Sequence, residues 1–188
     1  MADQKTKKEI SDASIAACQV ALMALAEEFY SGTITIDELE GSFKEELKRE
    51  YIRQYLYGIG GEQNMTKSDW EVVAKDLQNQ YKYAEEFIAQ LDIASQQDDE
   101  GESLKAMFWR FSLYALGAIA VYELANGLFH LADGYTEELW VVDPSVENCP
   151  DCLSYESMGW LEIGSFPEPG DWSTVCGSHC HCHKEYRK

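Results

Sequence analysis

The chain has 188 residues, of which 45% are hydrophobic and 26% are charged, and this composition is typical of a globular protein. Thirty-four Asp and Glu residues against fifteen Lys and Arg residues give a formal net charge of −19. This charge argues against nucleic-acid binding, because a phosphate backbone is bound by clustered cations, and it argues against docking on anionic lipid. It favours solubility, or a crowded assembly in which mutual repulsion limits unwanted contacts.

Targeting signals are not evident. The lysines near Met1 are followed by no apolar signal-peptide core. The most apolar stretch, residues 111–122, is twelve uncharged residues long, whereas a bilayer needs about twenty. We therefore expect a soluble protein made in a reducing cytosol, whose cysteines are thiols or metal ligands before they are disulfides.

The apolar residues of the first part of the chain recur at helical spacing. All four prolines lie after residue 143, so none interrupts a helix before it. The spacing predicts helices over residues 8–30, 36–57, 66–91 and 103–130. The second begins with a capping box of Thr35 and Glu38. It should end at a glycine turn formed by Gly58, Gly60 and Gly61. An acidic loop at 98–102 precedes the fourth helix, the most apolar of the set and the one expected at the centre.

The sequence pattern changes from helical to strand-like near residue 143. Short segments at 138–142, 160–163 and 180–186 resemble strands, and the segment from Phe166 to Asp171 is rich in turn residues. We predict a mainly α fold. A helical domain of about four helices at residues 1–143 is followed by a small zinc-stabilised, β-containing module at residues 144–188.

Five cysteines of this module follow the pattern C-x2-C-x23-C-x3-C-x-C. Two sulfurs separated by two residues can bind one ion from a tight turn, and a distant group completes the tetrahedron. Zinc is the default metal for a thiolate-rich site, and an ion can replace the core that so short a segment lacks. The pattern assigns Cys149, Cys152 and Cys176 as three of the ligands. Cys180 is the preferred fourth ligand, and Cys182 is a close rival for that position.

Two alternatives to zinc remain at this stage. The cysteines could be one or two disulfides or plain buried thiols. A redox dithiol at Cys149-Pro150-Asp151-Cys152 would need a helix start in a strand–helix context, and no helix is predicted there.

The histidines are weaker candidates for metal binding. His179, His181 and His183 alternate with the last cysteines, so they should face away from the metal, and His183 is only a reserve ligand. His130 should cap the fourth helix as a cation. Cys18 lies on the apolar stripe of the first helix and is expected in the core.

No catalytic motif is present, and we predict neither a catalytic residue nor an organic cofactor site. The sequence contains no nucleophile elbow, phosphate loop, dinucleotide fingerprint or H-E-x-x-H. Nothing in the pattern places two carboxylates in one apolar pocket, so they are interpreted as solvated faces. Four aromatic residues beside the glycine turn suit either the core or a protein interface; they are Tyr51, Tyr55, Tyr57 and Trp70.

The cysteine-rich tail resembles a known family. The segments 147–152, 159–167, 169–171 and 176–182 are similar to the C-terminal zinc-binding segment of the minor head, or head-morphogenesis, proteins of tailed bacteriophages. Softer similarity extends upstream through 57–61, 65–70, 80–83 and 110–114, so that it covers roughly residues 35 to 188.

This resemblance implies a non-enzymatic component of a phage head, assembled in the host cytoplasm. Its expected partners are the capsid or portal protein in an oligomeric assembly. The alternative function is a host-directed zinc adaptor or regulator that binds a protein. The acidic composition disfavours a nucleic-acid version of that adaptor, since the last residues add only Lys184, Arg187 and Lys188.

Overall fold

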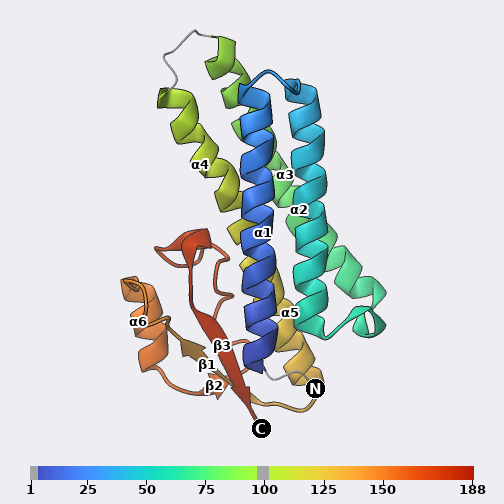
Figure 1. The fold of residues 1–188 in the computed structure, drawn as a ribbon. Coiled ribbons are helices and arrows are strands. Elements are labelled where there is room, and N and C mark those ends of the chain that lie inside the picture. Colours follow the sequence, from blue (N-terminus) through green and yellow to red (C-terminus); the bar gives the residue numbers. More distant parts are fainter. Residues whose placement is uncertain (1–3, 97–101) are drawn as a thin grey trace.

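A computed structural model describes residues 4–96 and 102–188, and Figure 1 shows a helical bundle with a small sheet at one end. The predicted fold class, mainly α with a small β-containing cysteine module, is confirmed. The bundle contains α1 (Gln4–Tyr30), α2 (Ile36–Ile59), α3 (Lys67–Gln96), α4 (Glu102–Leu116) and α5 (Ala118–Ala132). The rest comprises β1 (Glu137–Val141), α6 (Pro150–Ser157), β2 (Leu161–Glu162) and β3 (His183–Arg187), with short 3-10 turns η1 (Glu62–Asn64) and η2 (Gly177–His179).

Local signals place the ends of α2. The Glu38 amide donates to Thr35 Oγ1 at 3.3 Å and the Thr35 amide donates to Glu38 Oε2 at 2.8 Å, which is the predicted capping box. At the other end, Gly60 adopts φ 82° and closes the helix with a left-handed turn.

Gly58 does not break α2, contrary to the prediction. It lies inside the helix and is buried. A Cβ built on it would stand 2.5 Å from the Tyr122 carbonyl oxygen and 2.7 Å from Ala125 Cβ. Gly58 therefore allows α2 and α5 to approach closely, which is a packing role that sequence spacing alone did not reveal.

The predicted fourth helix is two helices, α4 and α5, divided at Gly117. A Cβ on Gly117 would stand 2.6 Å from the hydroxyl of Tyr51, which approaches from α2. Residues 111–122 are all buried or half-buried, as expected for the central segment of the bundle. Residues 98–101 of the predicted acidic loop lie outside the described residues.

The core of the bundle has two clusters. One joins α1, α2, α3 and α4 around Leu22, Phe43 and Phe111, and the other joins α2, α3 and α5 around Tyr55 and Val121. Trp70, for which the sequence left core and interface open, is 43% exposed. Cys18 is buried on α1, as expected.

Two stretches, Lys7–Tyr30 and Trp109–Ala132, are long and apolar enough to cross a membrane by length and composition alone. In the second stretch, 56% of an apolar 18-residue window is buried in the bundle. Core helices of soluble proteins pass the same test, so this property is weak evidence for a membrane span.

The sheet is antiparallel with strand order β2-β1-β3. Its central strand, β1, precedes residue 143, and both of its neighbours follow that residue. Trp140 of β1 is fully buried and contacts Tyr155 and Phe166, with ring centroids 5.0 and 6.1 Å away. This aromatic cluster lies against the cysteines and forms a small core of its own. The proposed division at residue 143 stays a prediction.

Candidate metal centre

The first two cysteines stand at the start of α6. Cys149 is the N-cap residue, with extended backbone angles, and Pro150 occupies the first helical turn, where its missing N–H costs nothing. Cys152 follows on the same turn and is 1% exposed. The structure thus places this dithiol at a helix start, which the sequence analysis did not predict. Amide groups at such a helix end stabilise thiolates.

The other three cysteines flank a tight turn near the end of the chain. Cys176 precedes η2, Cys180 follows it, and Cys182 comes directly before β3. Cys180 and Cys182 are 1% and 2% exposed. The Val175 amide donates to Asp151 Oδ2 at 2.8 Å, so α6 is bonded to the loop that carries Cys176.

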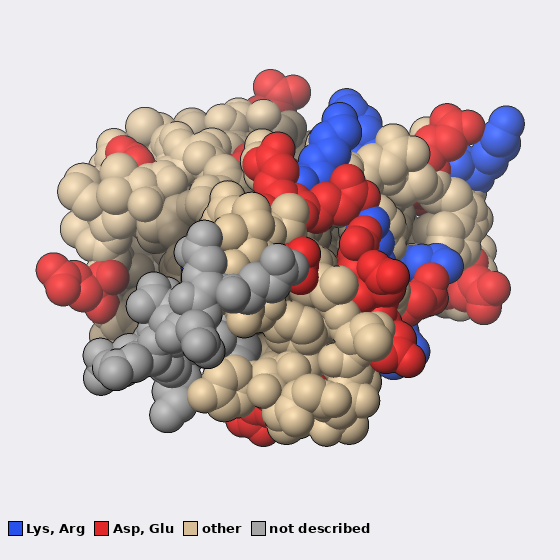
Figure 2. Space-filling model, turned by 90° about the horizontal axis from the view of Figure 1, so that it is seen from above, with Lys and Arg blue, Asp and Glu red and all other residues tan. Residues whose placement is uncertain are grey.

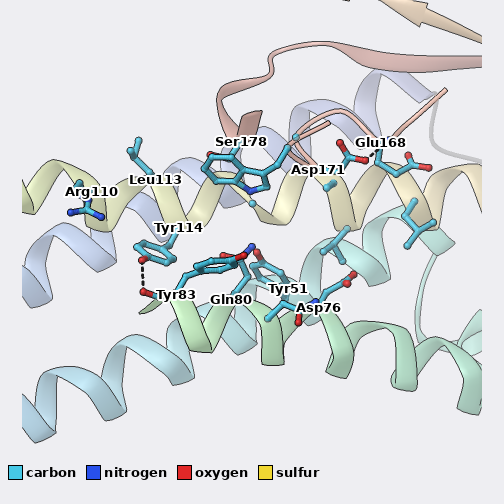
Figure 3. Close-up of a pocket in the computed structure, with 17 residues that line it drawn as sticks. Tyr51, Asp76, Gln80, Tyr83, Arg110, Leu113, Tyr114, Glu168, Asp171 and Ser178 are labelled. Carbon is cyan, nitrogen blue, oxygen red and sulfur yellow. Dashed lines mark hydrogen bonds between the residues drawn. The ribbon is translucent and has the colours of Figure 1, made fainter. Parts of the chain in front are cut away.

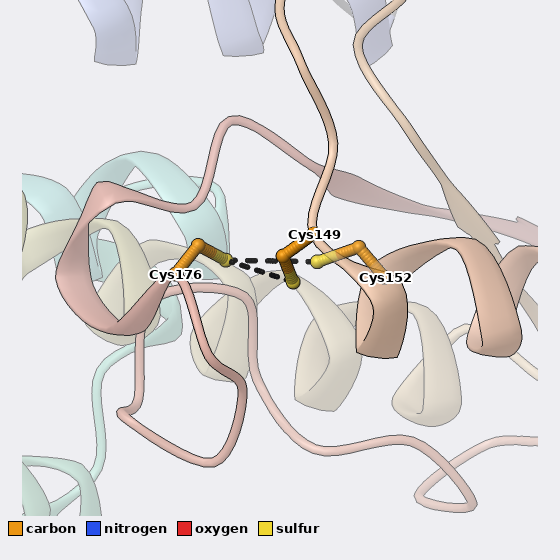
Figure 4. A group of neighbouring side chains, drawn as sticks. All are labelled: Cys149, Cys152 and Cys176. Carbon is orange, nitrogen blue, oxygen red and sulfur yellow. Dashed lines mark hydrogen bonds between the residues drawn. The ribbon is translucent and has the colours of Figure 1, made fainter.

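The five sulfur atoms form two trios that share Cys152. Cys149, Cys152 and Cys176 make one trio, and Cys152, Cys180 and Cys182 make the other, with all ligand atoms of a trio within 4.8 Å of one another. The Cys176 sulfur lies 3.6 Å from those of Cys149 and Cys152 (Figure 4). The sulfurs of Cys152 and Cys180 are 3.7 Å apart. The structure therefore brings all five predicted ligand residues together.

These separations fit shared metal coordination rather than disulfides. A disulfide has an S–S distance of about 2.05 Å, and all six cysteines are unbridged. Two thiolates bound to one tetrahedral zinc at about 2.3 Å would be about 3.8 Å apart. The cluster could thus hold a metal ion.

The protonation of the cluster shows why a cation suits it. Desolvation raises the pKa of the Cys149 thiol, yet the pKa is lowered on balance, because the amides of Cys152 and Cys176 donate to its sulfur. The pKa of Cys182 is lowered mainly by the neighbouring Cys180 thiol, while burial and neighbouring thiols raise the pKa of Cys152. One thiolate therefore opposes ionisation of the next, and a bound divalent cation would remove that conflict.

The terminal histidines behave differently from the cysteines. His179 and His181 are exposed, whereas His183 is half-buried near Glu185. His130, predicted as a cationic helix cap, does lie in the last turn of α5. It is nevertheless 8% exposed, stacks on Tyr186 with ring centroids 4.4 Å apart, and has a pKa lowered by desolvation. This packed environment disfavours the predicted cationic form.

A buried ionic cluster lies beside the cysteine module, and the sequence pattern did not predict it. Lys184, 2% exposed, lies on the same face of β3 as Tyr186. Its Nζ is 3.4 Å from Glu138 Oε2 and 2.6 Å from Glu168 Oε2, and its amide donates to Glu123 Oε2 at 3.3 Å. The expectation that carboxylates form only solvated faces is therefore wrong. The alternation of Cys180, Cys182, Lys184 and Tyr186 was the available signal, because every second residue of an extended segment shares a face.

Glu138 also stabilises the loop of the module. Its Oε1 accepts hydrogen bonds from the amides of Gly164 and Phe166, at 3.0 and 2.8 Å. Burial raises the pKa of Glu123 to about 8, against the lowering influence of Lys184. These contacts connect α5, β1, β3 and the loop, so the bundle and the cysteine module share a charged interface.

Comparisons with protein-family models, with curated proteins and with solved structures find no match to this chain. The geometry itself therefore defines the class: a mainly helical protein with a thiol cluster able to hold a metal ion.

Proposed function

We propose that the cysteine cluster is a structural zinc site that fastens the C-terminal segment onto the bundle. The observation that carries this proposal is the meeting of five thiols, from α6, from the turn around η2 and from the start of β3, in two trios sharing Cys152. Thiolates favour zinc among the common metals, and a site closed by four protein ligands is structural. Cys152 belongs to both trios, so it is a ligand whichever trio supplies most of the site.

We further propose that the protein has no turnover chemistry and is a component of a tailed-phage head that binds capsid or portal protein. The support is the resemblance of residues 147–182 to the zinc-binding segment of minor head proteins, together with the net charge of −19. On the face shown in Figure 2, Lys and Arg side chains stand among Asp and Glu side chains rather than in a separate basic patch. The net charge of −19 favours a protein partner over bare DNA.

The partner surface includes Trp70 in this proposal. Of the aromatic residues beside the glycine turn, Tyr51 and Tyr55 are core residues and Tyr57 is half-buried, while Trp70 is 43% exposed. An exposed tryptophan at the start of α3 can become desolvated in an interface, where such residues contribute about 2 kcal/mol or more.

Mass spectrometry of purified phage particles tests the head assignment. The wild-type chain should be present at a stoichiometric level. Trp70→Ala should reduce its incorporation, whereas Trp109→Ala, which removes another exposed tryptophan (60% exposed), should not. Absence of the wild-type chain from particles would contradict the head assignment and favour the host-directed zinc adaptor.

A further inference from the structure

A cavity of about 900 Å³ lies outside the metal centre, between α3, the junction of α4 and α5, and the loop from Glu168 to Ser178. Figure 3 shows side chains from these elements directed toward a common space, with Arg110 at one end and Asp76 toward the other. Neither the proposed zinc site nor the proposed head function uses this cavity.

The floor of the cavity is polar. A Cβ built on Gly117 would stand 2.6 Å from Tyr51 Oη, 3.4 Å from Gln80 Nε2 and 3.5 Å from the Tyr114 carbonyl oxygen. These polar groups therefore converge where Gly117 has no side chain. The Tyr51 hydroxyl is buried and lacks a hydrogen-bond partner among the described residues, and the same is true of the Ser178 hydroxyl. A buried polar group without a partner is costly unless a ligand or water satisfies it.

One wall carries a carboxylate that lacks a cation. Asp76 is half-buried, and with the side chains that the structure describes, those of residues 7–95 and 109–188, it forms no ion pair or hydrogen bond. Burial raises its pKa, against a lowering influence of Lys75. On the other wall, Glu168 already pairs with Lys184, and Asp171 accepts hydrogen bonds from Ser173. Asp76 is thus the carboxylate of this cavity best placed to pair with a ligand.

Aromatic rings border the same space. Tyr83 and Trp172 line the cavity and are 63% and 67% exposed. Trp172 has φ 71°, a left-handed conformation that is strained for a residue with a side chain. Its ring lies against Gly177, where a Cβ would be 2.8 Å from Trp172 Cε3. The loop therefore holds an exposed indole beside the cavity at the cost of backbone strain.

We propose that this cavity binds an organic cation, an ammonium or guanidinium group that pairs with Asp76 and donates a hydrogen bond to Tyr51 Oη. Such groups carry donors and no acceptor, which suits the Asp76 carboxylate and the Tyr51 hydroxyl oxygen. Tyr83 and Trp172 supply π faces for the charge. The cation is either a free amine or the basic side chain of a protein partner.

Isothermal titration calorimetry on the full zinc-loaded chain tests the proposal with two probes, spermidine and N-acetyl-arginine amide. Measurements at about 0.15 M salt screen the long-range attraction of an acidic protein for any cation. At least one probe should bind saturably. Asp76→Asn should weaken that binding by about tenfold or more, and Trp172→Ala by about fivefold. Matched controls are Asp37→Asn, which removes an exposed carboxylate from α2, and Trp109→Ala; both should leave affinity unchanged.

The two probes separate the two sources. Saturable binding of spermidine alone supports a free amine, binding of the capped arginine alone supports a basic side chain of a partner, and binding of both supports the shared chemistry. Lack of saturable binding by either probe would overturn the proposal. Equal weakening by Asp76→Asn and Asp37→Asn, or unchanged affinity in Trp172→Ala, would place binding elsewhere and overturn it as well. Circular dichroism establishes that each variant is folded.

Discussion

Replacing Lys184 with methionine removes the cation from the buried cluster between the bundle and the cysteine module. The lysine is 2% exposed, Glu138 is 0% exposed, and the Lys184 ammonium pairs with both Glu138 and Glu168. Methionine keeps much of the side-chain volume, so the main change is electrostatic. Removing one partner from a buried ion pair costs about 3–5 kcal/mol. For a chain of this size, that loss lowers Tm by about 6–20 °C.

Thermal unfolding followed by circular dichroism at constant zinc and neutral pH measures this loss. Lys75→Met is the matched control, because it removes an exposed lysine from α3 and should change stability by no more than about 0.5 kcal/mol. Adding Glu138→Gln and Glu168→Gln to Lys184→Met removes the unpaired charges and should restore much of the stability. A Tm for Lys184→Met equal to that of Lys75→Met would refute the charge-compensation argument.

Other predictions follow from the glycines, the buried Glu123 and the metal. Gly58→Ala should lower the free energy of unfolding, measured by chemical denaturation, by about 1–3 kcal/mol, because the new Cβ meets α5. Gly41→Ala in the same helix places its Cβ in open space and should raise that free energy by about 0.5–1 kcal/mol. Equal effects of the two substitutions would contradict the close approach of α2 and α5. The folded-state pKa of Glu123, about 8, lies above its unfolded value of about 4.3. The contribution of Glu123 to the stability of the fold is therefore present at low pH and is lost as pH rises toward 8. Glu123→Gln should therefore gain stability relative to wild type between about pH 6 and 8, by at most about 1.4 kcal/mol per pH unit, and a pH-independent difference would refute this. Chelation should disorder residues 144–188 while most helical circular dichroism persists, because the bundle has its own core clusters; a simultaneous loss of all helical signal would show one folding unit.

The helices were predictable where their signals are local. Thr35 and Glu38 form a capping box by themselves, and Gly60 supplies its own left-handed turn. The division of the fourth predicted helix was not predictable, because it occurs where the Tyr51 hydroxyl of α2 approaches Gly117. The role of Gly58 likewise depends on a neighbouring helix, which periodicity does not identify.

The cysteine cluster was predictable from spacing, because thiols separated by two residues share one turn and a later group can complete the site. The grouping into two trios was not, because it depends on how η2 and β3 meet α6. Pro150 at the first helical position was a usable signal for α6. The pairing of Lys184 with carboxylates from β1 and the loop required the tertiary structure.

The metal content of purified variants tests the central claim most directly. Elemental analysis of wild type, Cys152→Ser and Cys18→Ser, prepared side by side without chelator, compares the cysteine shared by both trios with a buried thiol on α1. We expect about one zinc per chain in wild type and in Cys18→Ser, and a large loss of zinc in Cys152→Ser. Wild-type protein without zinc, or Cys152→Ser with an undiminished zinc content, would contradict the proposed metal centre.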